Sequence, residues 1–235
     1  MKNVAILQAR MSSSRLPGKV MIPINDRPMI HWQIQRILNA SKITELVVAT
    51  SNHESDDILA NYLSELQIEV VRGSLENVSD RFNQSLINRD ADYFLRLTGD
   101  CPIIMPEIID EMITEFESDP TDYFSNTLEL TFPDGLDVEI ISRSAFQSLS
   151  KINQTDQERE HVTLGLYSRP HEFSLSNFRS PINLGNRRWT VDTLEDMEFI
   201  KLVFQYFKGR ETTFNLKDML LAEELTPEFR RIVPR

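Results

Sequence analysis

Two patterns of apolar and polar positions alternate through the first half of the chain. Short, mostly apolar runs predict buried strands at residues 3–9, 45–51, 68–73 and 92–100. Behind each run, apolar side chains recur three or four residues apart, which predicts amphipathic helices over about 30–38, 58–66, 78–86 and 108–116. Strands that alternate with such helices indicate an α/β fold, a mostly parallel sheet covered by helices on both faces.

The second half of the chain has a less regular pattern. Short strands and turns are predicted over 121–142, a helix over 156–168 and a strand over 173–180. The alternation then returns with a strand over 187–193 and a helix over 194–207, where Thr193 and Asp196 match a capping signature. A short helix is predicted over 215–225. We therefore expect one domain over 1–235, with a small β-rich insertion at about 125–185.

The overall charge limits the classes of partner. The formal net charge is −11, which argues against nucleic-acid binding and against binding to an anionic membrane surface. The single cysteine, Cys101, excludes an internal disulfide and suits a reducing compartment. No signal peptide and no apolar run of about 20 residues is evident. We therefore expect a cytoplasmic protein with no membrane segment.

One loop is rich in positively charged residues, although the chain as a whole is acidic. Residues 7–19 hold Arg10, Arg15 and Lys19, with three serines and Gly18 between them, directly after the first predicted strand. A following helix N-terminus attracts anions, and arginine and lysine side chains add charge for phosphate oxygens. The spacing is neither that of a Walker A loop nor G-x-G-x-x-G. The pattern predicts a site for a pyrophosphate or triphosphate group; the alternative is a solvated loop whose cations balance nearby acids.

Two carboxylates follow predicted strands. Asp100 comes directly after an apolar strand, behind Gly99, and Asp192 ends the predicted strand 187–193. Loops at the carboxyl ends of strands share one edge of such a sheet, so these acids and the cationic loop are expected to meet there. Mg²⁺ is usually held by one or two carboxylates and substrate phosphates. The combination favours a metal–phosphate site, although Asp192 could instead cap the helix that follows, and Asp100 could form an Asx turn.

Seven segments, in order from about residue 3 to 205, carry a family resemblance. They are "LQARMSSSRLPGKVM", "VVATS", "RGSLENVSDRF", "RLTGDCPII", "FPDGLDVEI", "EREHVT" and "RWTVDT". Together they resemble the spore-coat polysaccharide biosynthesis type of cytidylyltransferase, which is related to the CMP-sialic acid and CMP-Kdo synthetases. The resemblance implies a Rossmann-like, glycosyltransferase-A-like fold. It also implies a Mg²⁺-dependent transfer of CMP from CTP to a sugar or sugar acid, with release of pyrophosphate, in surface polysaccharide or glycan biosynthesis.

The resemblance also implies site residues. Asp100 and Asp192 would hold the metal, and Arg10, Arg15, Lys19 and Asp100 would be catalytic. The nucleotide would contact Gln8, Ala9, Arg10, Arg15, Lys19, Ala49, Thr50, Ser51, Arg72, Asn77 and Gly99. The acceptor would face Asp134, Asp137, Glu139, Arg159 and His161.

The residues alone leave the acceptor side more open. The carboxylates of "DGLDVE" suit hydrogen bonds to sugar hydroxyls, and Arg159 and His161 suit an anionic group. His161 could also act as a general base, because imidazole titrates near neutrality. The alternative for "EREHVT" is a solvated helix face. Cys101 is interpreted as a packing residue, because no neighbouring sequence feature marks a catalytic base for it.

Other functions and an assembly state follow from the same pattern. A glycosyltransferase that uses a nucleoside diphosphate sugar would share fold and metal, but it usually carries an Asp-x-Asp pair where this chain has one aspartate. A nucleotidyltransferase that prefers UTP or GTP, and a non-catalytic nucleotide-binding partner subunit, are further alternatives. We also expect a homodimer through the inserted region, where Leu128, Leu130 and Phe132 could supply apolar contacts.

Overall fold

The computed structural model describes residues 1–152 and 154–232. A seven-stranded sheet runs through it in the order β5-β4-β1-β6-β8-β7-β9. The first four strands in this order are parallel to one another, β8 is antiparallel to both β6 and β7, and β9 is parallel to β7. The strands span Asn3–Gln8 (β1), Leu46–Ser51 (β4), Glu69–Gly73 (β5), Tyr93–Thr98 (β6), Tyr123–Ser125 (β7), Glu139–Ser142 (β8) and Leu175–Asn177 (β9). A mostly parallel α/β sheet is thus confirmed.

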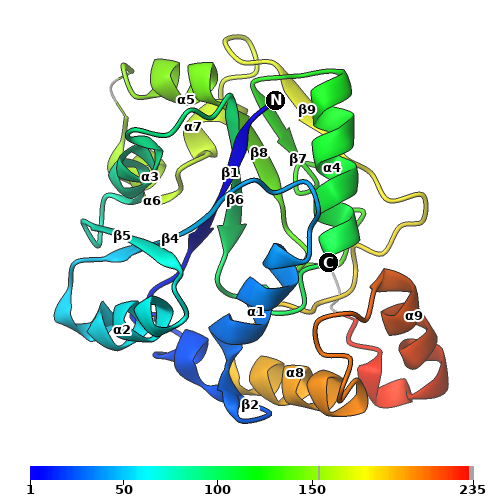
Figure 1. Ribbon diagram of the computed structural model, residues 1–235. Helices are drawn as coiled ribbons and strands as arrows, with labels where there is room; N and C mark the ends of the chain where they lie inside the picture. The colour runs from blue at the N-terminus through cyan, green and yellow to red at the C-terminus, as the bar shows by residue number, and fades with distance from the viewer. Residues whose placement is uncertain (153, 233–235) are drawn as a thin grey trace.

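Helices cover both faces of the sheet (Figure 1). Side chains of β1 alternate between two apolar cores: Ala5 and Leu7 pack with α1, α4 and α8, and Val4 and Ile6 pack with α3 and α5. This follows from the period of two in a strand. The helices span Met29–Leu38 (α1), Asp57–Glu65 (α2), Val78–Leu86 (α3), Pro106–Ser118 (α4), Arg143–Leu149 (α5), Asp156–Glu160 (α6), Leu164–Tyr167 (α7), Leu194–Tyr206 (α8) and Leu216–Leu225 (α9).

The second half differs from its prediction in three places. The predicted strand 187–193 is wrong: this segment makes only isolated bridges, at Arg187 and Arg188, and Asp192 lies in a connecting loop before α8. The predicted helix 156–168 is broken into α6 and α7 around His161. Phe132 is buried and stacks on Phe178, with ring centroids 5.4 Å apart, so it is unavailable for contacts between subunits.

Small elements complete the chain. Pro23–Ile24 (β2) and Arg27–Pro28 (β3) form a short hairpin before α1, and three-residue 3₁₀ helices cover Lys19–Met21, Glu54–Asp56 and Pro227–Phe229. Residues 125–185 hold β8 and β9 together with three short helices, α5, α6 and α7.

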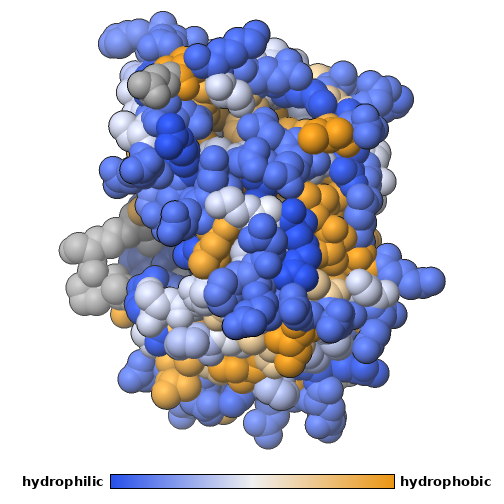
Figure 2. Space-filling view, turned by 90° about the vertical axis from the view of Figure 1, so that its left-hand side faces the viewer, coloured by the Kyte–Doolittle hydropathy of each residue, from blue (hydrophilic) through white to orange (hydrophobic). Residues whose placement is uncertain are grey.

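The surface is largely hydrophilic on the side shown in Figure 2, where apolar side chains form separate groups. None of the helices in the described ranges combines the length and apolar character that crossing a bilayer requires. Leu128 and Leu130 remain 37% and 45% exposed, in the segment for which a contact between subunits is expected.

Candidate active site

The cationic loop after β1 is fixed at both of its ends. Met11 N donates to Asp56 Oδ1 at 2.6 Å, and the same buried carboxylate accepts a hydrogen bond from Ser51 N at 3.1 Å. At the other end, Gly18 has φ +74°, and its N–H donates to Met11 O at 2.8 Å. Glycine adopts this left-handed conformation without steric cost. The loop therefore closes on itself and delivers Lys19 to the carboxyl edge of the sheet.

Lys19 brings the two predicted carboxylates together. Its Nζ lies 3.1 Å from Asp192 Oδ1 and 3.5 Å from Asp100 Oδ2, and it donates to Val191 O at 2.6 Å. Only 10% of the Lys19 side chain is exposed, so its charge is poorly hydrated and depends on these partners. The predicted meeting of the cationic loop with both acids is present.

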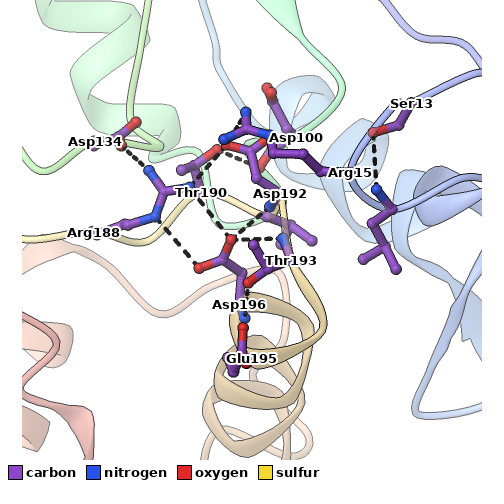
Figure 3. A network of polar contacts seen from close by, with 12 residues as sticks. Ser13, Arg15, Asp100, Asp134, Arg188, Thr190, Asp192, Thr193, Glu195 and Asp196 are labelled. Atoms are coloured by element: carbon purple, nitrogen blue, oxygen red, sulfur yellow. Dashed lines mark hydrogen bonds and ion pairs between the residues drawn. The ribbon is translucent and has the colours of Figure 1, made fainter.

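Three cations contact Asp192, and two of them, Arg15 and Arg188, are labelled in Figure 3. Arg15 Nη2 and Arg188 Nη2 each lie 2.8 Å from its Oδ2, while Lys19 approaches Oδ1. Burial acts to raise the pKa of Asp192, but Lys19, Arg188 and Arg15 outweigh it and lower that pKa below its usual value. The helix cap is supplied instead by Thr193, which forms a capping box with Asp196 as its sequence predicts.

Asp100 is the more accessible of the two acids. Its side chain is 30% exposed, and Oδ1 accepts a hydrogen bond from Thr98 Oγ1 at 2.6 Å. Its main-chain oxygen accepts from Val191 N at 2.9 Å, which joins the two acid-bearing loops. The neighbouring Cys101 is buried, and burial together with Asp100 raises the pKa of its thiol well above the usual value. A protonated, buried thiol agrees with a packing role.

The donor set suits a hard divalent cation that also binds substrate. The two carboxylates that contact Lys19, those of Asp100 and Asp192, can supply oxygen ligands. Mg²⁺ is commonly bound by one or two carboxylates, with substrate phosphates and water as its other ligands. Across residues 1–152 and 154–232, no three or more His, Cys, Asp and Glu side chains gather to hold a metal by themselves. Both Asp192 oxygens face cations, whereas among the described residues Asp100 forms one ion pair, the 3.5 Å contact with Lys19. Asp100 is therefore the better placed ligand.

Three cavities adjoin at this edge of the sheet. The central cavity, about 400 Å³, is lined by the loop after β1, by Asp100 and by Asp192. The α6-side cavity, about 810 Å³, lies between residues 74–77 and α6. The β8-side cavity, about 380 Å³, is lined by Tyr123, Glu139 and Tyr167, among others. Arg10 lines the first and second of these cavities, Arg96 lines the first and third, and His161 lines all three.

An ion pair forms the wall between the central and the β8-side cavity. Arg96 Nη1 pairs with Glu139 Oε1, and Tyr123 OH donates to Glu139 Oε2 at 2.8 Å. Arg96 also donates to Gln8 Oε1 at 3.3 Å, so Gln8 lies beside the pair. The Glu139 carboxylate thus has both oxygens occupied by protein groups. Arg96 was not among the residues predicted from the sequence, although a charge inside the apolar strand 93–98 was a signal for it.

The predicted nucleotide residues fall into two groups. Gln8, Ala9, Arg10, Arg15, Lys19 and Gly99 line the central cavity, and Asn77 lines the α6-side cavity, where its side chain caps α3. By contrast, Ala49, Thr50 and Ser51 are fully buried in β4. Arg72 donates to Ser51 O and His53 O and pairs with Asp57 at 2.7 Å. These four residues lie outside the linings of the three cavities.

Gly99 shows why the end of β6 needs glycine. A Cβ there would lie 3.0 Å from the Ala9 Cβ and 3.1 Å from Gln8 O. The loops after β1 and β6 therefore approach closely because this residue has no side chain.

The predicted acceptor residues are also divided. Asp134 pairs with Arg188 at 2.6 Å, and its pKa is raised chiefly by burial. Burial, with Asp134, Asp100 and Glu139 nearby, raises the pKa of Asp137 to about 7. Arg159 pairs with Asp156 at 3.1 Å on the wall of the α6-side cavity. His161 is exposed at the break between α6 and α7.

The fold is that of the α/β nucleotidyltransferases. The structure of CMP:2-keto-3-deoxy-manno-octonic acid synthetase complexed with CTP superposes on this chain with a TM-score of 0.66 at 20% identity. The superposition covers 88% of this chain and 99% of the synthetase.

Sequence comparison adds the family. The family model described as cytidylyltransferase matches residues 4–224. The spore coat polysaccharide biosynthesis protein SpsF of Bacillus subtilis (strain 168) is 35% identical over 207 residues, which are 85% of each chain. A cytidylyltransferase structure from Leptospira borgpetersenii has a TM-score of 0.93 at 28% identity and covers 100% of this chain and 99% of its own. This chain belongs to the cytidylyltransferase family, and the resemblance noted in the sequence is confirmed.

Proposed function

We propose that this protein transfers CMP from CTP to a sugar or sugar-acid acceptor, with release of pyrophosphate, in polysaccharide biosynthesis. The observation that carries the proposal is the row of three adjoining cavities: Arg10 and Arg96 each line two of them, and His161 lines all three. Such a row has room for a nucleoside, a triphosphate and an acceptor side by side. Family membership and the similarity to SpsF support cytidine as the base and polysaccharide as the context.

The central cavity suits the triphosphate. Arg15 and Lys19 would bind the β- and γ-phosphates, and Arg10 would lie near the α-phosphate, between the central and the α6-side cavity. Arginine binds phosphate oxygens through a planar fork, and lysine supplies a point charge. Since Arg15 and Lys19 now pair with Asp192, phosphate oxygens would compete with this carboxylate for the same cations.

The reaction is an in-line displacement at the α-phosphorus. The acceptor hydroxyl oxygen forms the new bond to phosphorus, the bond to the β-phosphate oxygen breaks, and pyrophosphate leaves. We assign His161 to accept the hydroxyl proton, because it lines both the β8-side cavity and the central cavity. Positioning and charge neutralisation contribute the rest of the rate.

Magnesium is part of this proposal. When bound, Mg²⁺ would be held by Asp100 and Asp192 and would neutralise charge on the phosphates. Titration of Mn²⁺ into the protein, followed by electron paramagnetic resonance, tests this binding without turnover. Asp100→Asn should weaken it, and unchanged Mn²⁺ binding in that variant would contradict the assignment.

Two further features belong to the proposal. The single, buried, unpaired cysteine supports a reducing, cytoplasmic setting. The exposed Leu128 and Leu130 support a homodimer through this segment, which light scattering on the wild type and on Leu130→Ser would test.

The decisive experiment measures pyrophosphate release over a panel of acceptors. Sugar acids, neutral sugars and phosphorylated polyols would each be combined with CTP, UTP, GTP and ATP. Release that requires both CTP and one acceptor class supports the proposal. Transfer from a nucleoside diphosphate sugar without pyrophosphate release would favour a glycosyltransferase instead, and lack of binding to any Mg²⁺–nucleotide would favour a non-catalytic subunit.

A further inference from the structure

Arg188 contacts three carboxylates from two segments of the chain, the loop at Asp134 and the stretch from Asp192 to Asp196 (Figure 3). Its Nη1 lies 2.6 Å from Asp134 Oδ2, and its Nη2 lies 2.8 Å from Asp192 Oδ2 and 3.3 Å from Asp196 Oδ2. Burial acts to lower the pKa of Arg188, but Asp192, Asp196 and Asp134 together raise it above the usual value. This guanidinium therefore stays charged and joins a predicted acceptor residue to a predicted metal ligand.

Asp196 holds Arg188 and the main chain at Asp192 in place. Its side chain is buried and accepts hydrogen bonds from the main-chain N–H groups of Asp192 and Thr193, both at 2.8 Å. Arg231 Nη2 lies 2.5 Å from its other oxygen, Oδ1. Asp196 thus holds the main chain of Asp192 directly. It also pairs with Arg188, which in turn contacts the Asp192 side chain.

The main chain around Asp134 is held against the same segment. Asp134 N donates to Arg187 O at 3.0 Å, and Trp189 N donates to Asp134 O at 2.7 Å. Gly135, with φ +108°, lies so close that a Cβ would be 2.5 Å from Thr190 N. The loop 133–136 therefore cannot shift without moving residues 187–190, which lead directly to Asp192.

The C-terminal segment also joins this network. Arg188 N donates to Arg231 O at 3.1 Å, and Arg187 forms a bridge with Ile232. Arg231 Nη1 donates to Glu195 O at 3.0 Å, at the start of α8. The last described residues therefore contribute directly to the surroundings of Asp192, which no motif in this region of the sequence indicates.

We infer that Arg188, supported by Asp196 and Arg231, is a positioning residue. It holds the acceptor-side loop at Asp134 and the phosphate-side carboxylate Asp192 in a fixed position relative to each other. The inference rests on the proposed function for its catalytic meaning. It requires the planar fork of arginine, because Nη1 contacts Asp134, Nη2 contacts Asp192, and Nε donates to Asp196 Oδ1 at 3.4 Å in addition to the Nη2 contact with Asp196. A lysine at 188 would keep the charge and lose this geometry.

The test compares Arg188→Gln and Arg188→Lys with a matched control, Arg187→Gln. Arg187 is the adjacent arginine, and it pairs with Glu223 on α9 at 2.7 Å, away from the three cavities. Isothermal titration with Mg²⁺–CTP gives the Kd, and the pyrophosphate assay gives kcat and the acceptor KM. Loss of a group that orients a ligand-binding side chain typically costs 10–100-fold, so we expect the Kd and the acceptor KM of Arg188→Gln each to rise about 10-fold or more.

The expected pattern separates positioning from simple stabilisation. Arg188→Lys should recover part of the melting temperature but little of the Kd or KM, whereas Arg187→Gln should lower the melting temperature and leave both constants within about twofold of wild type. The inference is overturned if Arg188→Gln lowers only the melting temperature. A wild-type protein that binds CTP without turnover would refute the proposed reaction, while the Kd comparison would still decide the role of Arg188.

A ligand-free measurement tests the contacts themselves. Double-mutant cycles on urea unfolding would combine Arg188→Gln with Asp134→Asn and, separately, with Asp192→Asn. Coupling in both cycles supports a link between the two loops even if the chain binds no nucleotide. Additive effects in either cycle would show that Arg188 does not join these two carboxylates, and would overturn the inference.

Discussion

Lys19 Nζ and Asp192 Oδ1 lie 3.1 Å apart, although 173 positions separate these residues in the chain. The same ammonium lies 3.5 Å from Asp100 Oδ2. One buried cation thus holds together the loop after β1, the turn after β6 and the loop before α8. In the proposed reaction this is where the triphosphate and the metal meet, so the predictions below concentrate on this edge of the sheet.

Asp100→Asn should lower kcat by roughly 100-fold or more, because in the proposed mechanism the variant loses a charged oxygen ligand for the Mg²⁺ that would neutralise the phosphates. The melting temperature should change little, since the side chain is 30% exposed and its contact with Lys19 is long. The measurement is CTP-dependent pyrophosphate release with differential scanning fluorimetry alongside. Asp90→Asn, which removes an exposed carboxylate paired with Lys2, is the control. Wild-type turnover by Asp100→Asn would contradict the role of this carboxylate.

His161→Asn should lower kcat by about 100- to 10,000-fold, the range typical for loss of a general base. The Kd for Mg²⁺–CTP should stay within about threefold of wild type, because Arg10, Arg15 and Lys19 remain. His171→Asn, at another exposed histidine, is the matched control. A kcat close to wild type would exclude His161 as the general base. A loss of CTP affinity equal to the loss of kcat would assign His161 to binding and not to proton transfer.

Asp137→Asn should stabilise the protein at alkaline pH and have little effect under acidic conditions. Burial, with Asp134, Asp100 and Glu139 nearby, raises the pKa of Asp137 to about 7 in the folded protein. Below about pH 3, well under the pKa of about 3.9 of an unfolded aspartate, the carboxyl is protonated whether the chain is folded or unfolded, so the wild type and the variant are equal at this position. As pH rises to about 7, the folded chain keeps a proton that the unfolded chain has released, and wild-type stability falls.

The size and the check of this effect follow from the same shift. Above pH 7 the variant should be more stable by up to roughly 4 kcal/mol, since each pKa unit corresponds to about 1.4 kcal/mol. Urea unfolding of both proteins at pH 4, 6 and 8 gives the difference directly. A difference that does not grow between pH 4 and pH 8 would contradict the raised pKa.

Gly135→Ala should destabilise the protein by roughly 3 kcal/mol, because a Cβ at φ +108° would lie 2.5 Å from the main chain at Thr190. Gly209→Ala is a matched control, since Gly209 also has a positive φ, +83°, but a Cβ there meets nothing within 4 Å. It should cost only about 1 kcal/mol. Chemical unfolding of both variants is the measurement. Equal costs would show that the close approach of the two loops contributes nothing.

Local patterns predicted the parallel half of the sheet well. The apolar runs of β1, β4, β5 and β6 and the helical stripes behind them were found to within about two residues, because each pattern reports burial of a single element. The capping box at Thr193 and Asp196 was found for the same reason, since its two members are three residues apart. The antiparallel strands are shorter and gave weaker signals.

Local sequence patterns could not predict the contacts between segments that are distant in the chain. The segment 187–193 has the apolar character of a strand, but it pairs only at single bridges and delivers Asp192 from a loop. Asp56 is one of several acids in its neighbourhood, and nothing local shows that it is buried against Met11 N. Arg188 likewise stands beside Arg187 in the sequence, and only the fold shows that one turns to α9 and the other to the predicted metal ligand.

The long sequence separation between Lys19 and Asp192 has a consequence for synthesis on the ribosome. A nascent chain that has exposed β1, β4 and β6 already has most of its parallel strands, yet it lacks the carboxylate that pairs with the ammonium at residue 19. Domains acquire such non-local contacts late, after the intervening chain has emerged. Affinity for nucleotide should therefore arise only when the segment after Arg188 has left the exit tunnel.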